Sequence, residues 1–315
     1  MLLSSGLPDS FRERLAAIIP PEDLPSVSAS FEIPDVSCAR VNTLKSDLKT
    51  VCDGLRSHGF SLQPVPLVPE AFVLSGGDRN SLSDDSLFKD GLAYQQAPSS
   101  LLPAVLLGPK PGERVLDACA APGSKTSQMA AMMQGQGEIV AVESVKGRFY
   151  KLRAVCELLG ARNVSIKLAD VRRLRFEGQS FDKVLVDAPC SSEGRFKVAI
   201  PKSFAYWSER KIKEMSHKQK GILLNAARGL KPGGVLVYST CTFAPEENEE
   251  VVDWFLRKTD GAFRLEQVDL PGVRRYTALL GWRNTVYKHD LAPCVRILPG
   301  EGFGGFFIAC FKREG

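Results

Sequence analysis

The chain has 315 residues, 44% of them hydrophobic and 24% charged, and a formal net charge of +5. This length can bury one large hydrophobic core and a second small one, which predicts two domains. No segment approaches the roughly 18 consecutive apolar residues of a membrane span, and the N-terminus lacks a basic region followed by an apolar block. We therefore expect a soluble cytoplasmic protein with no membrane partner.

Cysteines are scattered along the chain without any C-x2-C pair. There are eight of them, and only three histidines accompany them. This spacing matches neither a zinc site nor the disulfide framework of a small secreted domain. We expect reduced thiols and no metal.

The first part of the chain, residues 1–90, predicts a small α+β domain. The segment "CARVNTLK" (38–45) has the composition of a strand, and apolar residues then recur at helical spacing until Gly59 offers a C-terminal cap. Extended, proline-interrupted segments follow in "PVPLVPEAFVL" (64–74). The polar "SGGDRNSLSDDS" (75–86) indicates a domain boundary or an exposed loop.

Residues 91–315 show strands alternating with helices, which is typical of a parallel sheet covered on both faces. The chain closes with "CVRILPGEGFGGFFIACFK" (294–312), two strands around a glycine-rich turn, which predicts a final antiparallel hairpin. The parallel strands are expected at 114–118, 138–142, 164–169, 183–188 and 234–239.

The first parallel strand continues into "DACAAPGSKT" (117–126), a short Pro-Gly loop ahead of a helix that we expect to begin near Ser124. Such a loop lets the backbone approach a ligand, and the free N–H groups of the helix N-terminus face it. The glycine spacing fits neither a Walker phosphate loop nor G-x-G-x-x-G. These mismatches leave a nucleoside as a possible ligand of the loop.

Three acids stand at the ends of three successive strands. They are Glu143, Asp170 and Asp187. Each acid alone is more often a helix cap or a solvated turn residue. Together they line the carboxyl edge of the predicted sheet, where open α/β sheets bind ligands, and Glu143 is placed to bind ribose hydroxyls.

Two cysteines follow strand ends in loops rich in hydroxyl groups, Cys190 in "DAPCSSEG" and Cys241 in "YSTCTF". Such positions can expose a thiol and lower its pKa. Either cysteine alone could be structural, but together at one sheet edge they suggest a nucleophile and a partner. Cys52, Cys156 and Cys310 lie in apolar patterns and are expected in the core.

A basic segment follows the Cys190 loop. Residues 195–220 hold eight Lys or Arg and two Glu, interleaved with Phe196, Phe204, Tyr206 and Trp207. Phosphate neutralisation and base stacking need such a composition, although a solvated helix with its aromatics turned inward is the alternative. The residues expected to bind RNA are Arg195, Lys197, Lys202, Arg210, Lys211 and Lys213.

Several motifs together resemble the S-adenosylmethionine-dependent RNA 5-methylcytosine methyltransferases of the RsmB/NOP2/Sun family. The quoted segments "DACAAPGSKT", "DAPCSSEG", "STCTFAPEENE" and "GFGGFFIACFK" carry the resemblance, together with "RVNTLK" and "GLAYQQAPSS". It covers roughly residues 40–315. The resemblance implies a Rossmann-like class I methyltransferase sheet of seven strands, the last hairpin antiparallel, preceded by a small RNA-recognition-like domain.

Site roles follow from the same resemblance. Glu143 would hold the cofactor's ribose, Asp170 would lie near its adenine, and Asp187 would lie beside the methyl group and the target base. Cys241 would be the nucleophile and Cys190 would assist product release. The methionine part of the cofactor would be held by Cys119, Ala120, Ala121, Pro122, Gly123, Ser124 and Lys125.

Two thiols suit the chemistry, because C5 of cytosine is a poor nucleophile until a thiolate adds at C6. Afterwards the C5 proton must leave, which Cys190 could assist. Asp187 could stabilise charge at N3. Two departures from the family pattern bear on this: Ser192 stands where glycine is common, and the chain lacks the long extensions that help larger members choose their RNA.

The sequence thus predicts a monomeric RNA cytosine-5 methyltransferase, with ribosomal RNA slightly favoured over transfer RNA. A non-catalytic RNA-binding or ribosome-assembly protein on the same fold is the main alternative. A cysteine hydrolase would need a histidine beside a thiol, and His217 and His289 lie in no such motif. DNA as the substrate is a weaker variant.

Overall fold

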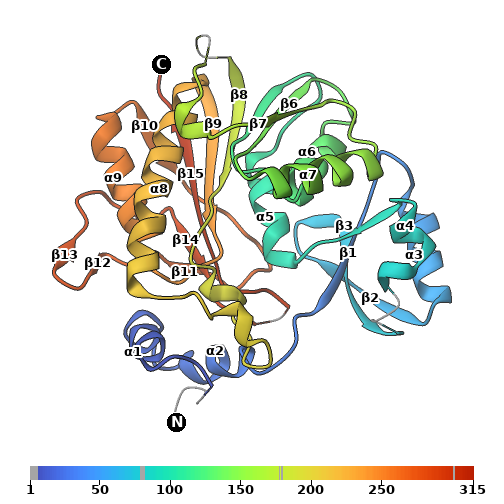
Figure 1. Cartoon of the computed structure of the whole chain (residues 1–315), viewed down its shortest axis with the longest axis horizontal. Coiled ribbons are helices and arrows are strands. Elements are labelled where there is room, and N and C mark those ends of the chain that lie inside the picture. The colour runs from blue at the N-terminus through green and yellow to red at the C-terminus, as the bar shows by residue number, and fades with distance from the viewer. Residues whose placement is uncertain (1–5, 79–81, 177, 179, 301) are drawn as a thin grey trace.

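The computed structural model describes residues 6–78, 82–176, 178, 180–300 and 302–315 (Figure 1). Its larger sheet is built on five parallel strands in the order β9-β8-β5-β6-β7. All five lie where the alternating pattern predicted them. Their bounds are β5 Arg114–Asp117, β6 Glu138–Glu143, β7 Val164–Leu168, β8 Phe181–Asp187 and β9 Leu230–Thr240.

Antiparallel strands extend this sheet beyond β9. The predicted final hairpin is present as β14 (Val295–Ile297) and β15 (Phe306–Arg313), with β15 paired to β9. Two further strands, β10 (Phe263–Glu266) and β11 (Tyr276–Thr277), pair with β15 and β14, which makes nine strands rather than the seven expected. At four and two residues, they are too short to show an alternating pattern in the sequence.

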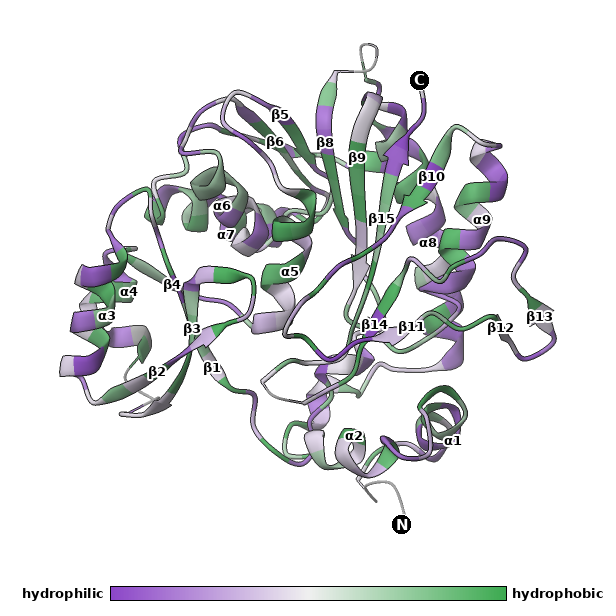
Figure 2. Cartoon of the chain, turned by 180° about the vertical axis from the view of Figure 1, so that it is seen from behind, coloured by the Kyte–Doolittle hydropathy of each residue, from purple (hydrophilic) through white to green (hydrophobic). Residues whose placement is uncertain are grey.

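Helices cover both faces of the larger sheet (Figure 1). One core lies between the sheet and α5, α6 and α7, and another lies between the sheet and α8 and α9. The inner strand β15 is predominantly hydrophobic, and β9 is hydrophobic over residues 235–237 (Figure 2), as burial on both faces requires. The bounds are α5 Pro98–Leu107, α6 Ser124–Met132, α7 Lys146–Leu158, α8 Glu209–Arg228 and α9 Glu249–Thr259.

A small antiparallel sheet, ordered β2-β3-β1-β4, forms a second unit with its own core. The helix predicted before Gly59 is present as α3, capped by the Asp47 side chain. Residues 79–81 of the predicted polar loop lie outside the described residues. The elements are β1 Ser37–Val41, α3 Leu48–Ser57, β2 Phe60–Val65, β3 Val68–Gly76, η1 Leu82–Asp84, α4 Ser86–Lys89 and β4 Ala93–Gln95.

The first two helices pack away from the small sheet. Phe11 of α1 (Asp9–Ile18) and Phe31, just after α2 (Leu24–Ser30), share a core with Phe196 and Phe243 of the larger unit. This packing suggests that residues 6–36 belong with the larger unit, and β4 uses residues beyond 90. A domain boundary at residue 90 stays a prediction.

Short elements complete the chain. A small hairpin, β12 (Gly281–Trp282) and β13 (Thr285–Val286), projects beside α9 (Figure 1). Single 3-10 turns occur at η2 Val171–Arg173, η3 Glu193–Arg195 and η4 Pro201–Ser203. Within the described part of the chain, no helix is both long enough and apolar enough to cross a membrane.

Candidate active site

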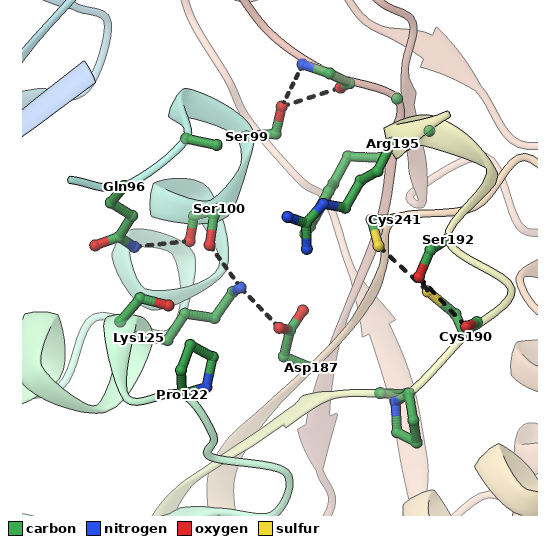
Figure 3. Close-up of a pocket in the computed structure, with 18 of the residues that line it drawn as sticks. Gln96, Ser99, Ser100, Pro122, Lys125, Asp187, Cys190, Ser192, Arg195 and Cys241 are labelled. Carbon is green, nitrogen blue, oxygen red and sulfur yellow. Dashed lines mark hydrogen bonds and ion pairs between the residues drawn. The ribbon is translucent and has the colours of Figure 1, made fainter. Parts of the chain in front are cut away.

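A cavity of about 730 Å³ opens at the carboxyl edge of the parallel strands (Figure 3). Its size suits a small-molecule ligand with room for part of a second one. Further lining residues come from the segments 26–36, 299–300 and 302–306, which lie outside the parallel strands. Of the predicted site residues, those that line it are Cys119, Ala120, Ala121, Pro122, Ser124, Lys125, Glu143, Asp170, Asp187, Cys190, Arg195, Lys197 and Cys241.

The predicted cofactor loop between β5 and α6 forms one wall of this cavity. Gly123 precedes α6 with φ +112°, and a Cβ there would lie 3.1 Å from Val155 and 3.2 Å from Leu152. Only glycine therefore permits this close approach of loop and helix. Asp117 anchors the loop by accepting a 2.7 Å hydrogen bond from Thr126, and burial raises the pKa of Asp117 to about 6.

Two of the predicted acids lie at the ends of β6 and just beyond β7. Glu143 is buried and accepts a hydrogen bond from Val145 N at 2.8 Å. Asp170 is bonded by Arg172, whose hydrogen bonds lower the pKa of that carboxyl. Carboxylates at these two strand ends can accept hydrogen bonds from the hydroxyl and amino groups of a nucleoside. The cavity therefore fits the nucleoside part of S-adenosylmethionine.

Lys125 connects the cofactor loop to Asp187 at the end of β8. Its ammonium donates to Asp187 Oδ2 at 2.7 Å and to Ser100 Oγ at 2.8 Å (Figure 3). The Ser239 hydroxyl donates to the other Asp187 oxygen, also at 2.7 Å. Asp187 is thus held in one orientation at the centre of the cavity. The sequence had placed Lys125 only with the cofactor's methionine part. Ser100 and Ser239 stand in the quoted "GLAYQQAPSS" and "STCTFAPEENE" segments, but the sequence assigned them no role.

The two predicted thiols face each other. The Sγ atoms of Cys190 and Cys241 lie 3.3 Å apart, although one follows β8 and the other β9 (Figure 3). The hydrogen bond with Cys190 lowers the pKa of Cys241, and Arg195 and Ser192 act in the same direction against burial and Asp187. The same contact, together with burial, raises the pKa of Cys190. One thiol of the pair is therefore favoured as the thiolate.

The three cysteines expected in the core behave as packing residues. Burial raises the pKa of Cys156 to about 12 and that of Cys310 to about 12. Cys52 is also buried with a raised pKa. Thiols in such surroundings stay protonated and inert. The expected division between core cysteines and a reactive pair agrees with this geometry.

A buried hydrogen-bond network fixes the loops that carry the thiols. Glu193 accepts from Trp207 Nε1 at 2.8 Å, Thr242 Oγ1 at 2.8 Å and Phe243 N at 3.0 Å. It thereby joins the loop after β8 to the loop after β9. The acid stands within the quoted "DAPCSSEG" motif, but nothing in the sequence showed that its partners would come from the second motif.

A second buried acid, Glu247, lies under the Cys190 loop. Its carboxylate accepts from Ser191 N at 3.0 Å and from Gln219 Nε2 at 2.7 Å. Burial raises the pKa of Glu247 to about 8. Glu247 stands within the quoted "STCTFAPEENE" motif. It precedes α9, which begins at Glu249, and it supports the thiol loop.

The predicted RNA-binding residues divide into those that can reach a ligand and those that already have a partner in the protein. Arg195 belongs to the first group, because its side chain reaches into the cavity beside Cys241 (Figure 3). The side chains of Lys202, Arg210 and Lys213 are exposed outside the cavity. Lys197 is instead bonded to Ser30 O at 2.9 Å and to Asp35 at 2.8 Å, and Lys211 pairs with Glu214 at 3.0 Å. Lys218, a member of the same basic run, also lines the cavity.

The aromatic residues of this segment differ in the same way. Phe196 is buried and Trp207 bonds to Glu193, so these two rings support the loop. Tyr206 is 88% exposed. Phe204 also packs in this cluster, against the ring of Phe196. Both interpretations of the segment therefore apply in part, since three of the four rings turn inward and Tyr206 is free to stack on a base.

Histidine and metal chemistry find no support in the part of the chain that the structure describes. No histidine lines the cavity, and His289 pairs with Asp253 at 2.8 Å, away from both thiols. Among these residues, no group of three or more His, Cys, Asp or Glu is placed to hold a metal ion. The cavity therefore offers a hydrolase no thiol–histidine pair.

Comparison with known proteins decides between the remaining alternatives. The model of the family described as 16S rRNA methyltransferase RsmB/F matches residues 104–312. The chain belongs to this family. A tRNA (cytosine(49)-C(5))-methyltransferase from Pyrococcus abyssi is 40% identical over 281 residues, which cover 87% of each chain. The chain is accordingly an S-adenosylmethionine-dependent RNA cytosine-5 methyltransferase.

Further RsmB/F relatives show how much of their length the chain spans. A ribosomal RNA small subunit methyltransferase F from Serratia proteamaculans is 36% identical over 98% of this chain but 63% of its own length. The chain spans 53% of the corresponding protein from Vibrio vulnificus. A solved structure titled as a methyltransferase homologue from Pyrococcus horikoshii has a TM-score of 0.83 and 32% identity, covering 98% of this chain and 96% of that one.

Proposed function

We propose that this RsmB/F protein methylates a cytosine through a covalent adduct between Cys241 and C6 of the base. The observation that carries the proposal is the pair of thiols 3.3 Å apart in the same cavity as Glu143 and Asp170. One ligand at the acid-lined end and a base at the thiol end would meet near Asp187. The lowered pKa of Cys241 and the raised pKa of Cys190 support Cys241 as the attacking thiol.

The first half of the reaction uses the thiolate of Cys241. Its sulfur bonds to C6 of cytosine, which moves electron density onto C5 and makes C5 nucleophilic. When bound, S-adenosylmethionine supplies the methyl group that C5 then acquires. The Lys125 ammonium, held on Asp187 at 2.7 Å, lies where it can offset the negative charge that develops on the ring.

The second half needs a base at C5. Cys190 first loses its thiol proton to solvent and then, as a thiolate, takes the C5 proton. The electrons of the C–H bond restore the C5=C6 double bond, and the C6–S bond breaks to return the thiolate of Cys241. The hydrogen bond with Cys241 is the first cause of the raised pKa of Cys190. Once Cys241 is bonded to carbon, it no longer carries the negative charge that opposes ionisation of Cys190.

RNA binding is assigned to the cavity rim and to the exposed start of α8. Arg195 enters the cavity and is placed to contact a phosphate of the target nucleotide, whereas Lys202, Arg210 and Lys213 lie outside it. The exposed ring of Tyr206 suits stacking on an unpaired base. Lys197 and Lys211, which already have acidic partners, would contribute less.

Two RNA classes are candidates for the substrate. The description of the family model names 16S rRNA, which agrees with the slight preference from the sequence. The similarity to the archaeal tRNA methyltransferase extends over 87% of both proteins, which favours transfer RNA. Both RNA classes are therefore tested, and cytosine 49 is the position to examine in transfer RNA.

The experiment uses purified protein with S-adenosylmethionine carrying a labelled methyl group. Transcripts of transfer RNA and of 16S rRNA are offered separately, and bisulfite sequencing locates any 5-methylcytosine. We expect the wild type to methylate one cytosine in one of the transcripts. The Cys241→Ala protein should methylate neither transcript. Methylation at another base atom, or full activity of Cys241→Ala, would contradict the proposed mechanism.

A further inference from the structure

Ser192 has a backbone conformation that is unusual for its residue type. Its φ is +60° and its ψ is 29°, in the left-handed region that favours glycine. Five described residues other than glycine have positive φ, and Ser192 alone of these lines the cavity. Strained backbone of this kind persists where the surrounding structure holds it, often at functional sites. The question is what holds Ser192 here and which contact the strain produces.

The neighbouring turn is bonded to the loop of the nucleophile. Gly194 N donates to Cys241 O at 2.9 Å, and the buried Glu193 bonds to Thr242 and Phe243. A side chain on Gly194 would meet Gly305 O at 2.3 Å, so the turn also lies directly against the loop before β15. These contacts leave the backbone at Ser192 little freedom to relax.

The consequence is the position of the Ser192 hydroxyl. Its Oγ lies 3.8 Å from Cys190 Sγ and donates to the Cys190 carbonyl oxygen at 3.4 Å (Figure 3). The hydroxyl is one of the groups that lower the pKa of Cys241, after Cys190 and Arg195. The hydroxyl thus touches Cys190 Sγ, and that sulfur lies 3.3 Å from Cys241 Sγ. By turning away from the Cys190 carbonyl oxygen, the hydroxyl can donate a hydrogen bond to a charged sulfur of the pair.

We propose that Ser192 is a positioning residue for the thiol pair: its left-handed backbone holds the hydroxyl against Cys190, the thiol that contacts Cys241, and so favours the thiolate of the nucleophile. The role of that thiolate in methyl transfer rests on the proposed function, but the contact between Ser192 and Cys190 does not. Glycine at this position would allow the same backbone without strain. It would lack the donor, so the strained serine provides a contact that glycine cannot.

Other charged groups near the thiols also affect the pKa values of Cys190 and Cys241. Asp187 raises the pKa of Cys241 and Arg195 lowers it. Glu247 raises that of Cys190, and Lys125 acts beside Asp187. All of them remain in place when Ser192 alone is changed, so a shift in the titration of Cys241 between variants reports the hydroxyl.

The experiment compares the wild type with Ser192→Ala and Ser192→Gly. Alanine keeps the Cβ and the backbone strain that it causes but removes the hydroxyl. Glycine removes the hydroxyl and the strain. Alkylation of Cys241 by iodoacetamide is followed by peptide mass spectrometry across pH, without RNA or cofactor. We expect the midpoint to rise by about 0.5–1 pH unit in both variants, since the thiolate loses a donor. Thermal unfolding should show Ser192→Gly at least as stable as Ser192→Ala.

Two results would overturn the proposal. An unchanged midpoint in both variants would mean that the hydroxyl does not act on Cys241. A shift in Ser192→Ala that is absent in Ser192→Gly would mean that the backbone, not the hydroxyl, is responsible. Because the titration needs no RNA, it can succeed in a protein that methylates nothing. Conversely, if the wild type methylates RNA but the midpoint is unchanged in both variants, only the role of Ser192 is refuted and the proposed function stands.

Discussion

The two halves of the catalytic sheet edge are built differently. On the thiol side, the loops after β8 and β9 are joined by buried bonds from Glu193 and Glu247. On the cofactor side, the acids after β6 and β7 bond to their own loop neighbours, Glu143 to Val145 N and Asp170 to Arg172. The thiol side connects two distant loops, whereas the carboxylates of the cofactor side make mainly local bonds.

This difference fits the proposed work of each half. A covalent step needs two sulfur atoms held at a fixed separation, and buried bonds between the loops provide that rigidity. A cofactor must enter and leave, so its carboxylates are better held by local bonds at the surface of an open cavity. We therefore expect changes on the thiol side to affect folding and chemistry together, and changes on the cofactor side to affect mainly ligand binding.

The largest effect on stability is expected for Glu193→Ala. The change leaves Trp207 Nε1, Thr242 Oγ1 and Phe243 N without their acceptor. Unpaired buried donors of this kind cost about 1–3 kcal/mol each before relaxation, so we expect a loss of about 3 kcal/mol in the free energy of unfolding. Urea unfolding measures it.

Glu214→Ala is the matched control for that prediction. Glu214 is an exposed glutamate whose ion pair is with Lys211, and its removal should change the free energy of unfolding by less than about 0.5 kcal/mol. Equal stability of the two variants would show that the Glu193 network does not hold the thiol side together.

On the cofactor side, Glu143→Ala should weaken ligand binding and leave the thiols unaffected. Glu143 is expected to accept two hydrogen bonds from the ribose, and their loss predicts a dissociation constant for S-adenosylmethionine about 10–100-fold higher, measured by calorimetry. The alkylation midpoint of Cys241 should stay at the wild-type value. An unchanged dissociation constant would mean that the ribose lies elsewhere in the cavity.

Glu247 gives the thiol side a distinctive pH dependence. Burial raises its pKa from 4.5 to about 8, so its contribution to stability is fully present below 4.5 and is lost as pH rises through 8. Within that window it should lower the free energy of unfolding by up to about 1.4 kcal/mol per pH unit. Urea unfolding at pH 5.5, 6.5 and 7.5 should show this slope in the wild type, relative to Glu247→Gln. Parallel pH profiles for the two proteins would contradict the assignment.

The smallest effect is expected outside both halves, on the exposed start of α8. Arg210→Ala combined with Lys213→Ala should weaken RNA binding a few-fold and reduce the salt slope by about one for each phosphate that is no longer neutralised. Lys49→Ala, an exposed lysine on the helix of the small sheet, is the control. An identical salt slope in the double variant would remove this part of α8 from the RNA-binding surface.

Prediction from the sequence succeeded where the signal was local. Most of the parallel strands contain a short apolar run, such as "IVAV" in β6 and "VLV" in β8 and β9. The residues at the strand ends, such as Glu143 and Cys241, follow directly from the strand positions. That both thiols would share one edge also follows from parallel strands ending on the same side. Their separation of 3.3 Å does not, because it depends on how two loops pack.

Contacts between distant segments were the part that could not be predicted. Nothing around Phe11 indicates that α1 packs on Phe196, 185 residues away, rather than on the small sheet. The same holds for the bonds from Glu193 to Thr242 and Phe243. Ser192 was noticed as a departure from the family pattern, but its left-handed backbone became visible only in the fold.

The most direct test of the central claim is a denaturing gel of Cys190→Ala and Cys241→Ala proteins incubated with S-adenosylmethionine and cellular RNA. A slow-migrating, nuclease-sensitive band from Cys190→Ala alone is predicted, because Cys241 still attacks while release is blocked. The trapped RNA can be sequenced to identify the target. A band from Cys241→Ala instead would reverse the two roles, and no band from either protein would contradict the covalent mechanism.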